Sequence, residues 1–174
     1  MRKIESMNGI RMNRKIIALA ILVLLVPGLA FAEEVREVEW MDLMPEEEQT
    51  AWDEASKNVD HSGYASAEEF QSWETVGEFD GQKIRIPGFV VPVETDGEGK
   101  LRTFFLVPYF GACIHVPPPP ANQIIYGRLE EPIEMVNIWD AFYMEGTLKI
   151  EEISNETADS AYTMAVDSLK PYSG

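Results

Sequence analysis

The chain has 174 residues, and its 30 acidic residues outnumber its 14 basic ones. A predicted signal peptide over residues 1–32 contains five of the basic residues and one acidic residue, so residues 33–174 keep 9 basic and 29 acidic residues, a net charge of −20. A domain this acidic repels phosphate backbones, which argues against nucleic-acid binding and favours a cation or a basic protein surface as the partner.

The signal peptide is predicted from the order of three features. A basic segment at 12–15 precedes an apolar run from Ile16 to Val26, and Ala30-Phe31-Ala32 has the small-x-small pattern of a cleavage site. The alternative is an uncleaved membrane anchor, but an apolar run of eleven residues is shorter than the roughly twenty that span a bilayer. Position 33 is Glu rather than Cys, which excludes lipidation at this cleavage site.

An acidic helical segment is predicted over residues 33–79. Residues 33–39 are charged and are expected to fray, so ordered structure should start at Trp40. Pro45 and the three glutamates that follow it are typical of a first helical turn, because proline is tolerated there and carboxylates complement the helix dipole. This helix is expected to end before Asn58.

A second short helix is predicted after a turn at 60–63. Ser66-Ala67-Glu68-Glu69 has the pattern of a capping box, in which the serine and a glutamate satisfy free backbone N–H groups. Phe70 and Trp73 are expected to face inward from this helix.

From residue 80 onward the apolar residues recur with the period of strands. Pro87-Gly88 interrupts the first strand and predicts a bulge or a sheet edge. Turns or loops are expected at 96–99, 130–132 and 154–159. Strands are predicted at 83–86, 89–93, 101–107 and 123–129, with one or two more within 133–150 and a last one at 161–169.

These elements predict a mainly β protein, a small OB-like barrel of five or six strands preceded by two short helices. A long first strand interrupted by glycine and a late strand that returns to close the sheet fit such a barrel. A β-sandwich is the alternative. The predicted organisation is a signal peptide at 1–32, an acidic helical segment at 33–79 and an OB-like β domain at 80–174.

Cys113 is the only cysteine, and His115 follows it by two residues. One cysteine cannot form an internal disulfide, and side chains two apart on an extended segment point to the same side. A thiolate and an imidazole there are suited to zinc or copper, but a structural zinc site needs four ligands. His61 and carboxylates such as Glu94, Asp96 or Asp140 are unspecified further ligands. The simpler interpretation is a buried cysteine beside a hydrogen-bonded histidine.

Pro117, Pro118, Pro119 and Pro120 predict a stiff polyproline segment directly after this pair. A thiol enzyme is a further hypothesis for Cys113 and His115, but no third group that would orient the histidine is visible. Asn122 is expected to tie the loop backbone together through local hydrogen bonds.

An aromatic platform for a partner is a third hypothesis for this region. The rings that would line a groove beside the prolines are Tyr109, Phe110, Trp139, Phe142 and Tyr143. The alternative is that these rings belong to the core, since aromatic side chains dominate burial in small barrels.

The sequence also resembles a known family at several motifs. These are FFLVPYFGACIHVPPPPANQIIYG, the preceding DGQKIRIPGFVVPVE, the later EGTLKIE and AYTMAVDSLKPY, and the early WMDLMP. Over about residues 40–172 the chain is similar to an uncharacterised family of exported Gram-negative bacterial proteins, a domain of unknown function with the pattern A-C-I-H-V-P-P-P-P-x-N. Its signature positions are Cys113, His115, Pro117 to Pro120 and Asn122.

This resemblance implies an OB-like fold and no established catalytic residue. Some members are encoded beside ABC-transporter components associated with zinc or other metals, which implies an accessory role in transport. We therefore expect a non-enzymatic periplasmic or secreted accessory protein, with no membrane span after cleavage, that binds zinc or another transition metal through Cys113 and His115. The alternative is a protein-interaction module of an envelope assembly, and a thiol enzyme is the third possibility.

Overall fold

The computed structural model describes residues 34–57, 71–112 and 118–173. The predicted signal peptide, the capping box at 66–69 and the site residues Cys113, His115 and Pro117 lie outside these ranges. The elements are β1 (Arg36–Glu37), η1 (Trp40–Leu43), α2 (Glu46–Lys57), η2 (Gly77–Phe79), β2 (Lys83–Thr95), β3 (Leu101–Val107), η3 (Ala121–Gln123), β4 (Ile125–Ile133), β5 (Ala141–Ser154) and β6 (Asp159–Pro171).

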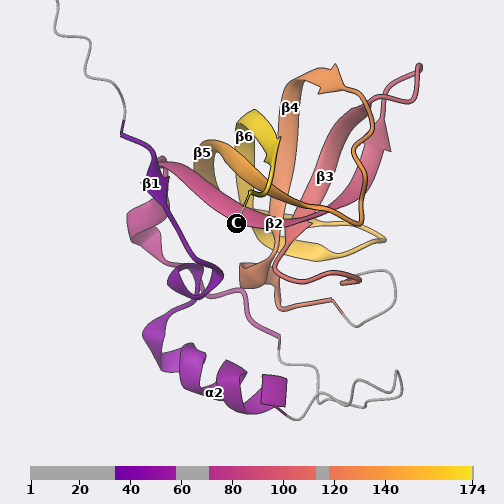
Figure 1. The fold of residues 1–174 in the computed structure, drawn as a ribbon. Helices are drawn as coiled ribbons and strands as arrows, with labels where there is room; N and C mark the ends of the chain where they lie inside the picture. The colour runs from indigo at the N-terminus through magenta and orange to yellow at the C-terminus, as the bar shows by residue number, and fades with distance from the viewer. Residues whose placement is uncertain (1–33, 58–70, 113–117, 174) are drawn as a thin grey trace, which may run out of the picture. The chain divides into compact units, whose positions relative to one another are not determined.

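The strands β2 to β6 form a closed barrel (Figure 1). The sheet order is β1-β2-β3-β4-β6-β5, and a further pairing between β2 and β5 closes it. The β4–β6 pair is parallel, and the short β1 adds to β2 in parallel, while the other pairs are antiparallel. The predicted mainly β, OB-like barrel is confirmed: within the described residues, five strands form the barrel, and one extra strand and one short α-helix precede them.

The long strand β2 pairs with β1, β3 and β5. From Ile84 to Val90 its residues alternate in direction, as strand residues do. Ile84, Ile86, Gly88 and Val90 are buried, whereas Arg85, Pro87 and Phe89 are partly exposed. The register with β5 runs unbroken through Pro87. On β2, Pro87 lies between Arg85, the last residue paired with β1, and Phe89, the first residue paired with β3. The Pro87 carbonyl accepts a 2.7 Å hydrogen bond from the Trp40 indole. A proline without an N–H donor is tolerated at such an open edge.

Apolar side chains form clusters on both sides of the barrel wall. The inner one is the main core and includes Phe104, Leu106, Ile125 and Met144. The second lies on the other face of β2, β3 and β4, where strand residues alternate in direction. Its buried members are Val91, Phe105, Val107, Ala112, Ile124, Tyr126 and Ala158. Ala112 belongs to the connection between β3 and β4, so this connection packs against the second cluster.

Three expectations from the sequence are corrected. The segment 33–39 does not simply fray, because Arg36–Glu37 pairs with β2 at Ile84 and Arg85. Trp73 does not face inward, since it is exposed and residues 71–76 are not helical.

The turn predicted at 130–132 is part of β4. From Arg128 to Ile133 the chain advances five residues, while its partner β3 advances two, from Thr103 to Leu101. The three extra residues bulge out of the ladder and leave the strand intact, as bulges do in barrels.

Tyr162 fastens the N-terminal segments to the barrel. It lies on β6, is fully buried, and donates a 2.9 Å hydrogen bond from its hydroxyl to the Leu43 carbonyl. The same hydroxyl accepts a 2.7 Å hydrogen bond from the Val76 N–H. Burial raises the pKa of Tyr162 to about 12, although the Val76 N–H acts in the opposite direction.

Stability should therefore fall in alkali through this group. The tyrosine pKa is near 10 when unfolded and about 12 when folded, so the unfolded chain loses its proton first. The stabilisation is complete below pH 10 and is lost as the pH rises toward 12. Tyr162→Phe should lower the free energy of unfolding by about 1–3 kcal/mol at neutral pH, because two buried backbone groups lose their partner.

The measurement is urea unfolding of both proteins at pH 7 and above pH 10. The difference between them should shrink in alkali, and the other tyrosines cancel because both proteins contain them. A difference that stays constant with pH would contradict the assignment.

Candidate functional site

The segment that carries Cys113 and His115 is bordered on both sides by buried residues. On the entry side, Gly111 adopts a left-handed conformation with φ 84°, which glycine tolerates at no steric cost, and Ala112 is buried. On the exit side, Pro119 and Pro120 are buried and η3 follows directly. Both flanks of the pair are therefore fixed to the barrel.

The described residues contain no group of three or more histidine, cysteine or acidic side chains that could hold a metal ion. Glu94 binds Thr103, with 3.3 Å between its Oε2 and the threonine hydroxyl. Asp96 accepts the N–H groups of Glu98 and Lys100 at the tip between β2 and β3. Asp140 accepts a hydrogen bond from Asn137. The structure therefore brings no three of these suggested ligands together within the described ranges.

Asn122 joins chain segments that are far apart in the sequence. Its side-chain NH₂ lies 2.9 Å from the Glu74 carbonyl oxygen, 3.1 Å from the Ser72 hydroxyl and 3.1 Å from Oε2 of Glu48. Its backbone N–H donates to the Ser72 carbonyl at 3.2 Å. The side-chain bonds expected to be local are thus long-range, and they tie α2 and residues 72–74 to the barrel.

Neighbouring groups complete this polar cluster. The Ser72 hydroxyl donates to Glu48 at 2.6 Å, and Gln123 donates to the Trp40 carbonyl at 2.9 Å. Asn122 is fully buried, and its Oδ1 has no hydrogen-bond partner within the part of the chain that the structure describes. No local pattern in the sequence points to Glu48 or Ser72, because 74 and 50 positions separate them from Asn122.

A group of aromatic rings lies on the other flank, where β3 ends. The Phe110 ring lies 5.9 Å from the Phe89 ring in an edge-on arrangement and 4.9 Å from the Trp139 ring. Phe110 is 41% exposed and Trp139 is 63% exposed. We call Phe89, Phe110 and Trp139 the aromatic surface. The interpretation of these rings as core is wrong for Phe110 and Trp139, whereas Phe142 is buried in the core.

Tyr109 and Tyr143 differ from the aromatic surface in their surroundings. Tyr109 is half-buried and packs against the second apolar cluster. Tyr143 lies under the Arg85 guanidinium, 3.8 Å from the ring centroid, and its ring centroid is 4.9 Å from that of Tyr172. The predicted aromatic platform is therefore divided into an open part around Trp139 and a part already covered by a cation.

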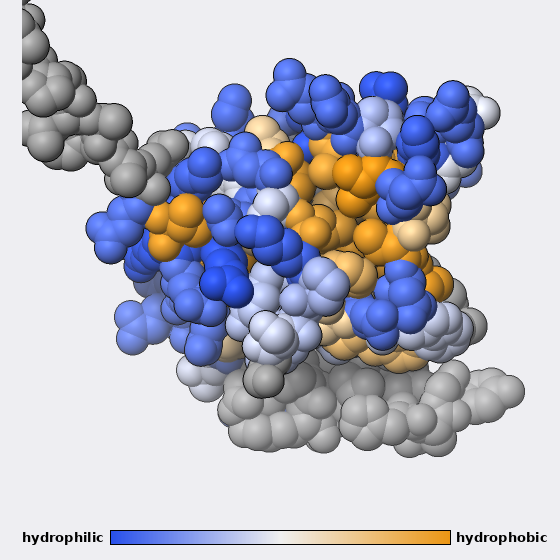
Figure 2. Space-filling model, turned by 45° about the horizontal axis from the view of Figure 1, so that its top comes forward, coloured by the Kyte–Doolittle hydropathy of each residue, from blue (hydrophilic) through white to orange (hydrophobic). Residues whose placement is uncertain are grey.

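Apolar surface remains open elsewhere as well. Figure 2 shows a face on which apolar side chains form a continuous area bordered by hydrophilic ones. Large apolar side chains that are exposed in the described ranges include Trp73, Phe110, Met135, Trp139, Ile150 and Tyr172.

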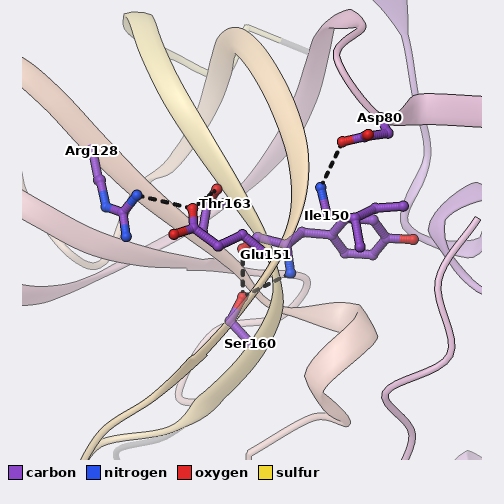
Figure 3. Close-up of polar contacts among 7 residues, drawn as sticks. Asp80, Arg128, Ile150, Glu151, Ser160 and Thr163 are labelled. Carbon is purple, nitrogen blue, oxygen red and sulfur yellow. Dashed lines mark hydrogen bonds and ion pairs between the residues drawn. The ribbon is translucent and has the colours of Figure 1, made fainter. Parts of the chain in front are cut away.

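A polar cluster on the barrel wall has a different character (Figure 3). Glu151 accepts hydrogen bonds from the Thr163 hydroxyl at 2.8 Å and from Arg128 at 3.1 Å. The Thr163 hydroxyl and the Arg128 guanidinium hold the pKa of the Glu151 carboxyl below its ordinary value. Arg128 is also placed over the Tyr126 ring. Glu151, Thr163 and Arg128 form their polar contacts with one another, so this cluster gives no indication of a ligand.

The chain matches one family model across most of its length. Residues 40–171 match the model described as protein of unknown function DUF3299. The chain belongs to the DUF3299 family. The resemblance found from the sequence is confirmed at this level, while the role of the A-C-I-H-V-P-P-P-P-x-N pattern stays a prediction.

A solved structure supports the DUF3299 assignment. The crystal structure of a DUF3299 protein from Pseudomonas aeruginosa PAO1 is 32% identical in sequence, with a TM-score of 0.66. The match covers 81% of this chain and 98% of that one. No curated protein matches the chain. These comparisons establish fold and family, and neither names an activity.

The helices within the described ranges are too short or too polar to cross a bilayer.

The buried amide of Asn122 should contribute strongly to stability. We expect Asn122→Asp and Asn122→Ala each to lower the free energy of unfolding by about 1–3 kcal/mol or more, because buried acceptors lose their donor. Asn122→Asp keeps the shape of the side chain but replaces the NH₂ donor by a carboxyl oxygen beside Glu48, so it changes the polar contacts while packing stays the same.

The measurement is chemical denaturation followed by circular dichroism, with Gln82→Ala as an exposed control that should stay within about 0.5 kcal/mol of the wild type. Wild-type stability in Asn122→Asp would show that the network is not the anchor described above.

Proposed function

We propose that this DUF3299 protein is a non-catalytic periplasmic accessory protein that binds a partner protein through the aromatic surface. The observation that carries the proposal is the stack of Phe110 and Trp139, which stay exposed in a protein with a well-formed core. Solvent-exposed tryptophan and phenylalanine side chains that pack on each other supply the large, rigid contact area typical of interface hot spots.

The position of the aromatic surface also supports this role. Phe89 is on β2, and Phe110 and Trp139 are on the connections that follow β3 and β4. A barrel strand and two loops thus converge on one place, and loops on a rigid scaffold commonly carry binding functions. The expected signal peptide at 1–32 supports export, and the family resemblance supports a link to transport.

A second proposed function is binding of zinc or another transition metal by Cys113 and His115. The supporting observation is that Ala112 and Pro119 are buried on either side of the pair. Anchored flanking residues reduce the conformational entropy that a binding event must remove. Further ligands would come from a partner or from solvent.

The first proposal predicts that partner capture depends on the exposed rings. Residues 33–174, immobilised and exposed to envelope extract, should retain a specific partner that the double variant Phe110→Ala/Trp139→Ala retains at least tenfold less, because hot-spot truncations cost about 2 kcal/mol or more. Quantitative mass spectrometry of the eluates measures the ratio.

The control is Ile150→Ala, which removes an exposed apolar side chain from β5. It should capture the partner as the wild type does. Equal capture by the double variant would refute the role of the aromatic surface.

The second proposal predicts zinc binding that needs both side chains. Metal-free residues 33–174 should bind zinc more tightly than about 0.1 mM by calorimetry, a limit that corresponds to roughly 5–6 kcal/mol. Cys113→Ala and His115→Ala should each weaken binding at least tenfold, and Glu98→Gln, an exposed change at the loop between β2 and β3, should not. Binding that is unaltered in both variants would remove the proposal.

A further inference from the structure

The aromatic surface has two exposed rings, and acidic residues lie close to one of them in the chain. Trp139 directly precedes Asp140, and Glu134 lies on the same connection between β4 and β5. Both carboxylates are exposed. The two connections that carry the exposed rings, residues 108–112 and 134–140, contain no lysine or arginine. The segments that carry the exposed rings therefore contribute negative charge and no lysine or arginine.

Elsewhere in the described ranges, arginines of the protein lie over aromatic ring faces. Arg36 lies 4.6 Å from the Phe79 ring centroid, Arg85 lies 3.8 Å from that of Tyr143, and Arg128 lies 5.1 Å from that of Tyr126. Trp139 has no such cation within the described ranges, although indole is the ring that attracts cations best.

From these observations we infer that the aromatic surface takes a basic segment of a partner protein, with a lysine or arginine side chain over the Trp139 ring. This inference rests on the proposed partner-binding function and specifies the chemistry of the partner. The ring faces supply cation–π attraction, and the carboxylates of Asp140 and Glu134 supply complementary charge.

Charge argues against the other occupants of such a surface. Residues 33–174 carry a net charge of −20, so a second copy of the chain would bring two strongly acidic surfaces together. An anionic membrane surface would be repelled for the same reason. A basic polypeptide can form a cation–π contact with Trp139 and is also attracted by the negative charge of this protein.

The test uses two synthetic peptides with capped ends, one with four arginines in a glycine–serine background and one with four glutamates in place of the arginines. Calorimetry with residues 33–174 should detect the arginine peptide and not the glutamate peptide. Trp139→Leu keeps the apolar bulk and loses the ring, and it should weaken binding about tenfold, whereas Trp139→Phe should retain most of it.

Matched charge variants separate a local site from general attraction. Asp140→Asn and Glu98→Gln each remove one negative charge, but Glu98 lies on the connection between β2 and β3 and pairs with Lys100. Asp140→Asn should weaken peptide binding at least threefold and Glu98→Gln should not.

Several results would overturn the inference: no binding of the arginine peptide, wild-type affinity in Trp139→Leu, or equal losses in Asp140→Asn and Glu98→Gln. Self-association through Trp139, or binding to anionic vesicles that requires Trp139, would also overturn it. If the arginine peptide fails while envelope capture still depends on Phe110 and Trp139, the partner-binding function stands and only the basic character of the partner is wrong.

Discussion

The arrangement of this protein depends on one buried side chain, the amide of Asn122. The barrel strands hold one another through their ladders, but of the described residues before β2 only the two of β1 belong to a ladder. Asn122 reaches Glu48, Ser72 and Glu74, and so it fixes these segments to the exit of the polyproline run. Leaving a buried polar group without a hydrogen bond destabilises the fold by more free energy than a formed hydrogen bond contributes. A buried network such as that of Asn122 therefore favours one arrangement of the chain over others.

The hydrogen bonds of Asn122 also indicate a structural role for the prolines that precede it. Pro119 and Pro120 are buried and directly precede η3. The buried hydroxyl of Tyr162 forms hydrogen bonds with the backbone of Leu43 and Val76. Pro119, Pro120 and Asn122 therefore serve the framework of the fold.

The strands were predictable from the sequence, and the contacts between distant segments were not. Leu101–Val107 was predicted with its observed bounds because its apolar residues and flanking turn residues are local signals. The bulge at 130–132 was misread as a turn, because Glu-Glu-Pro has turn chemistry and the register that absorbs it is set by a partner strand. The partners of Asn122 have no local signal at all. Composition favoured burial of the aromatic residues, and only the fold reveals that Phe110 and Trp139 stay open.

The parallel pairing of β4 with β6 has a consequence for how the protein acquires its fold. β6 is the last strand in the chain and lies between β4 and β5, so the barrel cannot close until residues 159–171 are available. Two of the ladders, β2–β5 and β4–β6, join strands that are distant in sequence, and non-local pairings of this kind slow folding to milliseconds or seconds. Until residues 159–171 are present, β4 and β5 each lack the partner that β6 supplies, and unpaired strand edges of this kind can pair with other chains.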